Sequence, residues 1–166
     1  MVKLEPITPE NVFVYKTIRL RALLDSPTAF SSTYAQESQR SDDEWLQRAR
    51  LWSSPPCTGY LAFEEETPCG LVACFGEAHN TEFATVISMW VDSAYRRTGA
   101  GTALIEALKS WAFARGLCEL RLMVTSVNTS ALRFYERLGF HMTGKTEPYP
   151  NDPAIIEHEM ALRLHL

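Results

Sequence analysis

The chain has 166 residues, enough for one domain with a buried core, whereas two complete domains would be cramped. Hydrophobic residues make up 46% and charged residues 22%, a composition that excludes a disordered chain and a fibrous repeat. A net charge of −4 argues against broad binding to nucleic acid or to an anionic membrane, so any polyanion needs a local site.

The N-terminal residues MVKLEPITPENVF lack the apolar stretch of a signal peptide, and no run approaches the ~18 apolar residues that span a bilayer. A cytoplasmic protein is therefore expected. No repeat or linker divides the chain, which predicts a single domain over residues 1–166. The cysteines show no metal-ligand spacing, so we expect no metal and four buried thiols: Cys57, Cys69, Cys74 and Cys118.

The N-terminal elements are marked by capping signals. A first strand is expected over residues 2–8, and Thr8 followed by proline is a good start for a helix that runs to about Leu24. The mixed, polar residues 25–40 predict a surface excursion or a broken helix, a common place for specificity. Acidic residues at the start of 41–52 predict a second helix.

The middle of the chain favours strands. Residues 59–65 and 69–78 are expected to form a hairpin around the turn ETP, and the nearly continuous apolar run 83–92 is typical of a central strand covered on both faces. The residues that follow have apolar side chains at helical spacing, and Gly116 ends that helix.

The C-terminal part alternates again. A strand is expected over 118–125, a helix over 128–139, and two strands over 140–145 and 155–163, joined by the turn EPYPNDP. This order of elements indicates an α/β fold with both sheet faces partly covered. The apolar strands near the C-terminus would suit a homodimer.

Two glycines and two arginines stand at the junction of the central strand with the next helix, in YRRTGAGTALIEALKSW. A strand that turns into a helix through small residues leaves several amides pointing into one hollow, at the positive end of the helix dipole. Gly99 and Gly101 let an anion approach the main chain, and Arg96 and Arg97 add charge at the rim. The junction therefore predicts a phosphate or pyrophosphate site, unless it is only a tight turn with solvated arginines.

Two familiar phosphate motifs fit this junction poorly. A P-loop would need a lysine directly after Gly101. The dinucleotide fingerprint would need a third glycine where Leu104 stands. A protein that binds ATP or NAD stays open as an alternative.

A third pattern, [Arg/Gln]xxGx[Gly/Ala], is carried by Arg96, Gly99 and Gly101 after the strand ISMWVD. Together, MWVDSAYRRTGAGTALIEAL and VNTSALRFYERLGF resemble the GNAT superfamily of acetyl-CoA-dependent N-acetyltransferases. The resemblance implies a GNAT-type mixed, mostly antiparallel central sheet of about seven strands, flanked by about four helices. It also implies acetyl-CoA as cofactor and a primary amine, of a small molecule or an exposed peptide, as acceptor. The alternative hypothesis is a non-catalytic protein that senses acyl-CoA.

The resemblance assigns roles along both segments. Main-chain groups of Met89 and Val91 would hold the pantetheine arm as an added strand, and a distortion of that strand would free the Met89 amide near the thioester carbonyl. Asn128 would help to place the cofactor, and Tyr135 would face the leaving sulfur. The implied cofactor-binding set is Met89, Val91, Arg96, Arg97, Thr98, Gly99, Ala100, Gly101, Thr102, Asn128 and Tyr135.

Tyr135 also lies on the apolar face of its expected helix, so by itself it would suit the core. A thiol has a reference pKa of ~8.5 and tyrosine ~10, which makes full proton transfer to the thiolate uphill by ~2 kcal/mol. Tyr135 is therefore expected to stabilise the thiolate by a hydrogen bond, with proton transfer late at most.

The general base and the acceptor site are less defined. Glu77 and Glu37, acting directly or through water, are the candidate bases, with His79 behind them, although either carboxylate also suits an ordinary surface. Arg133 and Arg137 could meet the adenosine phosphates or form a solvated helix face. The acceptor-side candidates are Phe30, Tyr34 and Trp45.

Overall fold

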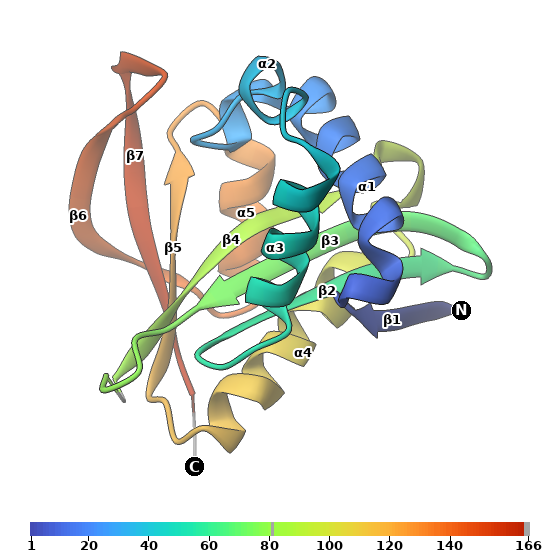
Figure 1. Cartoon of the computed structure of the whole chain (residues 1–166). Helices are drawn as coiled ribbons and strands as arrows, with labels where there is room; N and C mark the ends of the chain where they lie inside the picture. The colour runs from blue at the N-terminus through green and yellow to red at the C-terminus, as the bar shows by residue number, and fades with distance from the viewer. Residues whose placement is uncertain (81, 165–166) are drawn as a thin grey trace.

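A computed structural model describes residues 1–80 and 82–164 (Figure 1). Seven strands form one sheet in the order β1-β2-β3-β4-β5-β7-β6. The strands are β1 (Val2–Pro6), β2 (Cys57–Glu64), β3 (Thr67–Phe75), β4 (Phe83–Val91), β5 (Glu119–Thr125), β6 (His141–Tyr149) and β7 (Asp152–Arg163). The helices are α1 (Val12–Asp25), α2 (Tyr34–Glu37), α3 (Asp42–Trp52), α4 (Ala100–Ala114) and α5 (Thr129–Arg137), with 3-10 turns η1 (Pro9–Asn11), η2 (Pro27–Ala29) and η3 (Ser93–Tyr95).

The sheet confirms the expected mixed, mostly antiparallel architecture. Neighbouring strands are antiparallel except β4 and β5, which are parallel. β4 is the fourth of the seven strands, as expected of the apolar run. The described residues form five helices rather than about four, because the excursion contributes the single turn α2.

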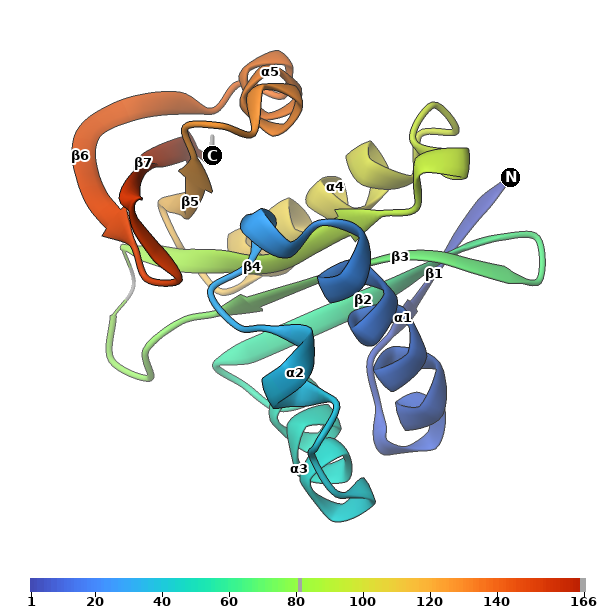
Figure 2. The same cartoon turned by 90° about the horizontal axis from the view of Figure 1, so that it is seen from above.

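Helices cover both faces of the sheet, as Figure 2 shows from above. α4 and α5 pack on one face around a cluster that includes Leu104 and Leu108, and α1 and α3 pack on the other around Tyr15 and Trp45. Two cores therefore sandwich the sheet, and the central strands contribute side chains to both.

Local signals explain how the helices begin and end. The Ser41 hydroxyl caps α3 by accepting a hydrogen bond from the Glu44 amide, and the Glu44 carboxylate in turn accepts one from the Ser41 amide. α4 ends at Ala114, and Gly116 follows with φ +75° as expected of a terminating glycine. The helix expected from Thr8 begins instead as η1, so the α-helical residues start at Val12.

The two hairpins differ from the sequence predictions at their turns. The β2–β3 turn is formed by Glu65 and Glu66 instead of ETP, because Thr67 and Pro68 already belong to β3. The turn between β6 and β7 shrinks to residues 150–151, and both strands extend into the proline-rich segment. β6 is an edge strand, where a proline such as Pro148 is tolerated.

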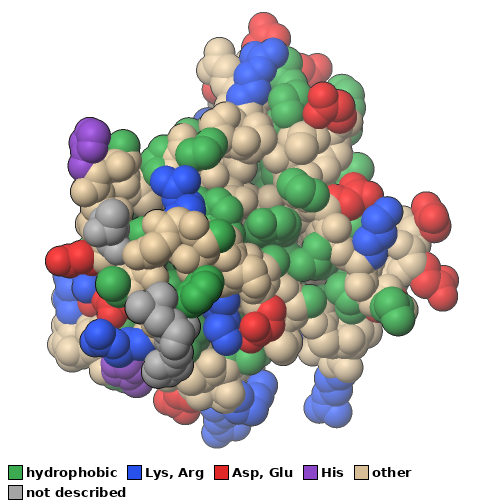
Figure 3. Space-filling model, turned by 90° about the horizontal axis from the view of Figure 1, so that it is seen from below, with side chains coloured by type: hydrophobic (Ala, Val, Ile, Leu, Met, Phe, Trp, Pro, Cys, Tyr) green, Lys and Arg blue, Asp and Glu red, His purple; other side chains and the backbone are tan. Residues whose placement is uncertain are grey.

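Three cysteines are buried as expected, and burial raises the pKa of the Cys74 thiol to about 12. The expectation for Cys118 is wrong, because it is exposed just after the turn that ends α4. No helix in the described residues is long and apolar enough to cross a bilayer. Side chains of both charge signs are interspersed over the face in Figure 3.

Candidate active site

The central sheet splits between its two parallel strands. β4 and β5 pair only where residues 83–85 meet residues 119–121. β5 continues along β7 as far as Thr125, while β4 diverges from it, as Figure 1 shows. The β4 edge beyond Thr85 therefore offers main-chain groups that an extended ligand can pair with as an added strand.

A β-bulge interrupts β4 beside this split. Leu71 pairs with Trp90 and Ala73 with Ile87, so one residue of β3 faces two of β4. Ser88 adopts φ +59°, a conformation that side chains rarely take. The bulge turns Met89 toward the core under α4 and leaves Ile87 and Trp90 on the α1 side. The strand distortion that the resemblance implied is therefore present.

Beyond β4 the chain reaches α4 through a glycine. Gly99 has φ +89°, and α4 begins at the next residue. The Ala103 amide donates to the Gly99 carbonyl at 2.9 Å, so the amides of residues 100–102 have no acceptor within the helix. The Thr98 amide is already donated to Tyr95 at 3.2 Å. The amides that remain free to bind an anion therefore belong to the first turn of α4 and to the glycine before it.

Gly101 has a packing reason of its own. A Cβ atom there would lie 3.0 Å from the Phe134 ring and 3.4 Å from the Met89 methyl. Glycine therefore lets α4, α5 and the bulge of β4 meet closely. The same junction joins the anion site to the split in the sheet.

The two arginines of the motif have different surroundings. Arg96 donates through Nε to the Val91 carbonyl at 2.9 Å and through Nη2 to Asp25 at 3.1 Å. Hydrogen bonds from Trp90 and Ser26, together with Arg96, lower the pKa of Asp25. Arg96 therefore ties the loop to the end of α1, whereas exposed Arg97 has no ion-pair partner among the described residues and can add charge at the rim.

The second motif lies on α5. Asn128 caps this helix by accepting the Ala131 amide at 3.2 Å. Tyr135 is 7% exposed and packs edge-on between Phe134 and Phe140, with ring centroids 5.3 and 5.4 Å away. Burial raises the pKa of Tyr135, so its phenol stays protonated and can act as a hydrogen-bond donor.

Comparison with known proteins agrees with this geometry. Residues 20–140 match the model of the acetyltransferase (GNAT) family. The chain belongs to the GNAT family. It is 41% identical over 115 residues to the ribosomal protein bS18 alanine N-acetyltransferase of Escherichia coli, which covers 69% of this chain and 76% of that protein.

Other relatives are longer or more distant. A mycothiol acetyltransferase of Thermobispora bispora is 31% identical over 136 residues, 82% of this chain. The GNAT chain spans less than half the length of several curated relatives that it matches, including 44% of this one. A solved GNAT acetyltransferase from Streptococcus pneumoniae shares the fold, with a TM-score of 0.80, 19% identity, and coverage of 99% of this chain and 100% of that one.

Of the two carboxylates expected as bases, Glu77 lies away from the bulge in this GNAT chain. Glu77 is exposed, like His79, in the loop that leads to the start of β4. Met89 lies six positions along β4 from Phe83, which is roughly 20 Å of strand. The structure therefore does not bring Glu77 to the split.

Glu37 is fully buried and accepts from Arg19 Nε at 3.0 Å and from Nη2 at 2.8 Å. Burial alone would raise the pKa of Glu37, but hydrogen bonds and charge from Arg19 outweigh it and lower the pKa. Both oxygens of Glu37 are thus engaged, which makes this carboxylate a poor proton acceptor.

The three residues expected on the acceptor side lie in different surroundings. The Arg19 guanidinium covers the Phe30 ring at 4.8 Å from its centroid, and Tyr34 is 38% exposed at the start of α2. Trp45 is only 1% exposed and packs against Tyr15. The structure therefore places Trp45 in the core between α1 and α3 instead of at the acceptor side.

Sequence reasoning missed a set of contacts that hold η2 over the split sheet. Tyr149, at the end of β6, donates its hydroxyl to the Pro27 carbonyl at 3.0 Å. Asn151 donates to the Phe30 carbonyl at 3.3 Å, and the Thr125 hydroxyl donates to Thr28 at 3.3 Å. The polar turn YPND was a visible signal, but its partners stand about 120 positions earlier in the chain, where no local pattern points.

One titratable group on this side was also missed. Glu157 of β7 lies opposite Thr125 on one side and Glu147 on the other, and it is partly buried. Burial, and then the charge of Glu147, raise the pKa of Glu157. Arg133 and Arg137 are exposed on α5.

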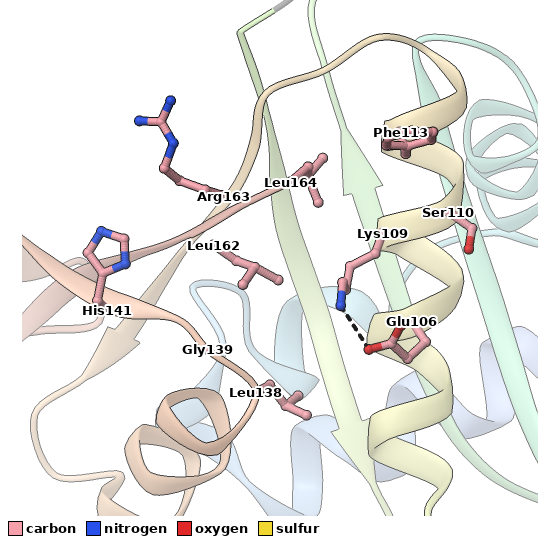
Figure 4. A pocket seen from close by; sticks show the side chains of 10 residues that line it. All are labelled: Glu106, Lys109, Ser110, Phe113, Leu138, Gly139, His141, Leu162, Arg163 and Leu164. Carbon is pink, nitrogen blue, oxygen red and sulfur yellow. Dashed lines mark hydrogen bonds and ion pairs between the residues drawn. The ribbon is translucent and has the colours of Figure 1, made fainter. Parts of the chain in front are cut away.

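A cavity of about 770 Å³ lies elsewhere (Figure 4). It lies between α4 and the strands that follow α5, with Phe113, Leu138 and Leu164 on its apolar side and a Lys109–Glu106 ion pair of 3.0 Å at its rim. It holds none of the residues assigned above to the cofactor or acceptor, so the split in the sheet stays the candidate active site.

Proposed function

We propose that this GNAT chain is an N-acetyltransferase that moves the acetyl group of acetyl-CoA directly to a primary amine of a small molecule or of an exposed peptide, in the cytoplasm. The single observation that carries the proposal is the bulge at Ser88 and Met89, placed between the open edge of β4 and the first turn of α4. A nucleotide would need only the anion-binding turn, whereas the open edge of β4 at the split in the sheet suits a ligand with an extended arm.

The residues present fit coenzyme A. The free amides at the start of α4 and the charge of Arg97 suit its diphosphate, and nothing lies within 4 Å of the place where a Cβ of Gly99 would stand. The β4 edge from Val86 to Val91 suits the two amides of the pantetheine arm. When bound, acetyl-CoA supplies an acetyl group activated as a thioester.

The chain's own groups would then act on the two ends of the reacting bond. The Met89 amide, whose residue has no register partner on β3 at the bulge, is the proposed hydrogen-bond donor to the oxyanion that develops on the acetyl carbonyl. The Tyr135 hydroxyl is the proposed donor to the departing sulfur, since its raised pKa keeps the proton on the phenol. Asn128 would hold α5, and with it Tyr135, in register by capping the helix.

The acceptor would enter on the η2 side. There the Pro27–Phe30 segment and the turn of the β6–β7 hairpin are joined by hydrogen bonds and wall the far end of the split. Tyr34 and the covered ring of Phe30 are the proposed acceptor-side residues. The named relatives include enzymes for a ribosomal protein alanine and for a small molecule, so both acceptor classes belong in the proposal.

The test is an acceptor screen. Release of free thiol from acetyl-CoA is followed with a panel of small amines and short peptides, and acetylated products are identified by mass spectrometry. Thiol release that depends on a particular amine supports the proposal. Tight coenzyme A binding without thiol release from any amine would instead support a sensor, and stronger thermal stabilisation by ATP or NAD than by coenzyme A would support a nucleotide-binding protein.

A further inference from the structure

An acceptor amine with a pKa of about 10 is mostly protonated at neutral pH and must lose a proton before or during attack. The described structure places Glu77 at the far end of β4 and engages Glu37 with Arg19, so neither carboxylate is available beside the bulge. If the chain transfers acetyl groups as proposed, another group must take this proton.

The register of the sheet shows which residues lie level with the bulge. Thr85 and Arg121 form the last pair between β4 and β5, so three to four residues further along the strands Ser88 and Met89 on β4 and residues 123–125 on β5 lie on the two sides of the split. Thr125 pairs in turn with Glu157 of β7. Neighbouring strands are spaced by about 4.8 Å, so Glu157 lies one strand beyond β5, across the split from the bulge.

Side-chain direction places Glu157 on the acceptor side. Leu122 and Val124 point into the core under α4, and the alternate residue Thr125 points the other way, where its hydroxyl reaches the Thr28 carbonyl at 3.3 Å. Directly paired residues of neighbouring strands share a face. Glu157 therefore projects toward η2, on the side opposite α4 and α5.

The charged groups around Glu157 leave its carboxylate unneutralised. On β6, Glu147 stands opposite it and is itself paired with Lys145 at 3.3 Å. On β7, Glu159 accepts a hydrogen bond from Thr143 at 2.8 Å. Thr125 of β5 is uncharged, as are all residues from Pro27 to Phe30 of the covering segment. Glu157 itself takes part in no ion pair within the described residues.

We propose that Glu157 is the general base of the acetyl transfer. As the amine nitrogen bonds to the acetyl carbon, the carbon–sulfur bond breaks and the thiolate leaves, stabilised by the Tyr135 hydroxyl. One nitrogen proton passes to the Glu157 carboxylate, directly or through one water, and the thiolate is later protonated from solvent.

The decisive variant is Glu157→Gln, compared with Glu159→Gln as a matched control on the same strand and face. Glu157→Gln is expected to lower kcat/KM at neutral pH by roughly 100-fold or more, the usual contribution of a general base. Raising the pH, or using an amine of lower pKa, should recover part of the rate. Coenzyme A affinity and the melting temperature should stay near wild type, and Glu159→Gln should remain active.

A second variant tests the electrostatics without removing the base. Glu147→Gln deletes the negative charge opposite Glu157, which lowers the pKa of Glu157, so the acid limb of the kcat/KM profile should move to lower pH. NMR titration of the Glu157 carboxyl in the protein alone should show the same shift.

Wild-type turnover by Glu157→Gln overturns the assignment, as does a loss confined to Glu159→Gln or an acid limb that Glu147→Gln does not move. An inactive wild-type chain in the acceptor screen would instead reject the proposed function, and the base with it.

Discussion

At the scale of single residues, Tyr135 shows how one side chain serves packing and chemistry together. Its ring lies between Phe134 and Phe140, so the core requires an aromatic residue there. Only the hydroxyl is not needed for this packing, and no hydrogen bond within the described structure engages it. The same burial that makes Tyr135 a core residue raises its pKa and keeps its proton available as a donor.

Tyr135→Phe should separate these two roles. The ring is retained, so the melting temperature should change little, while kcat at saturating substrates should fall about tenfold or more because the departing sulfur loses its donor. Because the raised pKa keeps the phenol protonated, wild-type kcat should show no loss attributable to this residue as the pH rises to about 10. An unchanged kcat in the variant would remove Tyr135 from the mechanism.

At the scale of elements, the bulge in β4 is maintained against a local preference for regular strand. Residues around Ser88 are apolar and favour strands, and serine at φ +59° is strained relative to glycine. Flanking contacts compensate, because Met89 packs near Gly101 under α4 and Trp90 donates to Asp25 at 3.0 Å. The distortion therefore follows from what the neighbouring elements fix.

Substitutions at Ser88 should report on the bulge. Ser88→Gly should raise the free energy of unfolding by up to about 1 kcal/mol, because glycine adopts the positive φ without strain. Ser88→Val should lower it by at least about 1 kcal/mol, because a β-branched side chain resists this conformation. Urea denaturation of the two variants checks the sign, and a Val variant as stable as wild type would mean that β4 can form a regular ladder.

The two arginines in the loop between β4 and α4 have different roles: one stabilises the fold and the other contributes to cofactor binding. Arg97→Ala should weaken coenzyme A binding about fivefold, mainly at low salt, while leaving the melting temperature unchanged, because its charge lies exposed at the rim. Arg96→Ala should lower the melting temperature, because the Val91 carbonyl and Asp25 both lose a donor.

Isothermal titration calorimetry and thermal unfolding of both arginine variants make the comparison. Equal effects of the two substitutions on stability and on affinity would contradict this division.

At the scale of the whole molecule, the excursion between α1 and α3 is held over the acceptor side by contacts that span the chain. Arg19 and Glu37 form a buried ion pair, and Tyr149 reaches back from β6 to the Pro27 carbonyl. This polar segment has little regular structure, but its position is fixed because one end is bonded to β6 of the sheet and the other end to α1.

Glu37→Gln should reduce the free energy of unfolding by about 3 kcal/mol, since it leaves the buried Arg19 without its counter-charge. The folded pKa of Glu37 lies below its ordinary value of 4.5, so the pair contributes fully above that pH and its contribution is lost as the pH falls through the folded pKa. The variant should therefore lose less stability than wild type on acidification below about 4.5.

Urea denaturation at pH 7 and at pH 4 measures the difference. Replacing the pair together, as Arg19→Met with Glu37→Leu, should restore part of the stability, because no buried charge then remains unpaired. A single variant as stable as wild type would show that Arg19 finds another partner.

The sequence by itself determined the order of the strands and helices along the chain, the helix α3 with its acidic first turn, the central place of β4 and the glycine-rich start of α4. These features depend on neighbours within a few positions, so periodicity, caps and motifs reveal them. The lengths of β6 and β7 were less accessible, because prolines read locally as a turn are tolerated along a sheet edge.

Only the tertiary structure decided the bulge at Ser88, the partner of Arg96, the burial of Trp45 and the place of Glu157 beside the split. Each depends on residues far away in the chain: Asp25 stands 71 positions before Arg96, and the strand opposite Glu157 follows from sheet order. Local preference is silent about such pairings, because the free energy that selects them comes from packing between layers and from charges brought together by the fold.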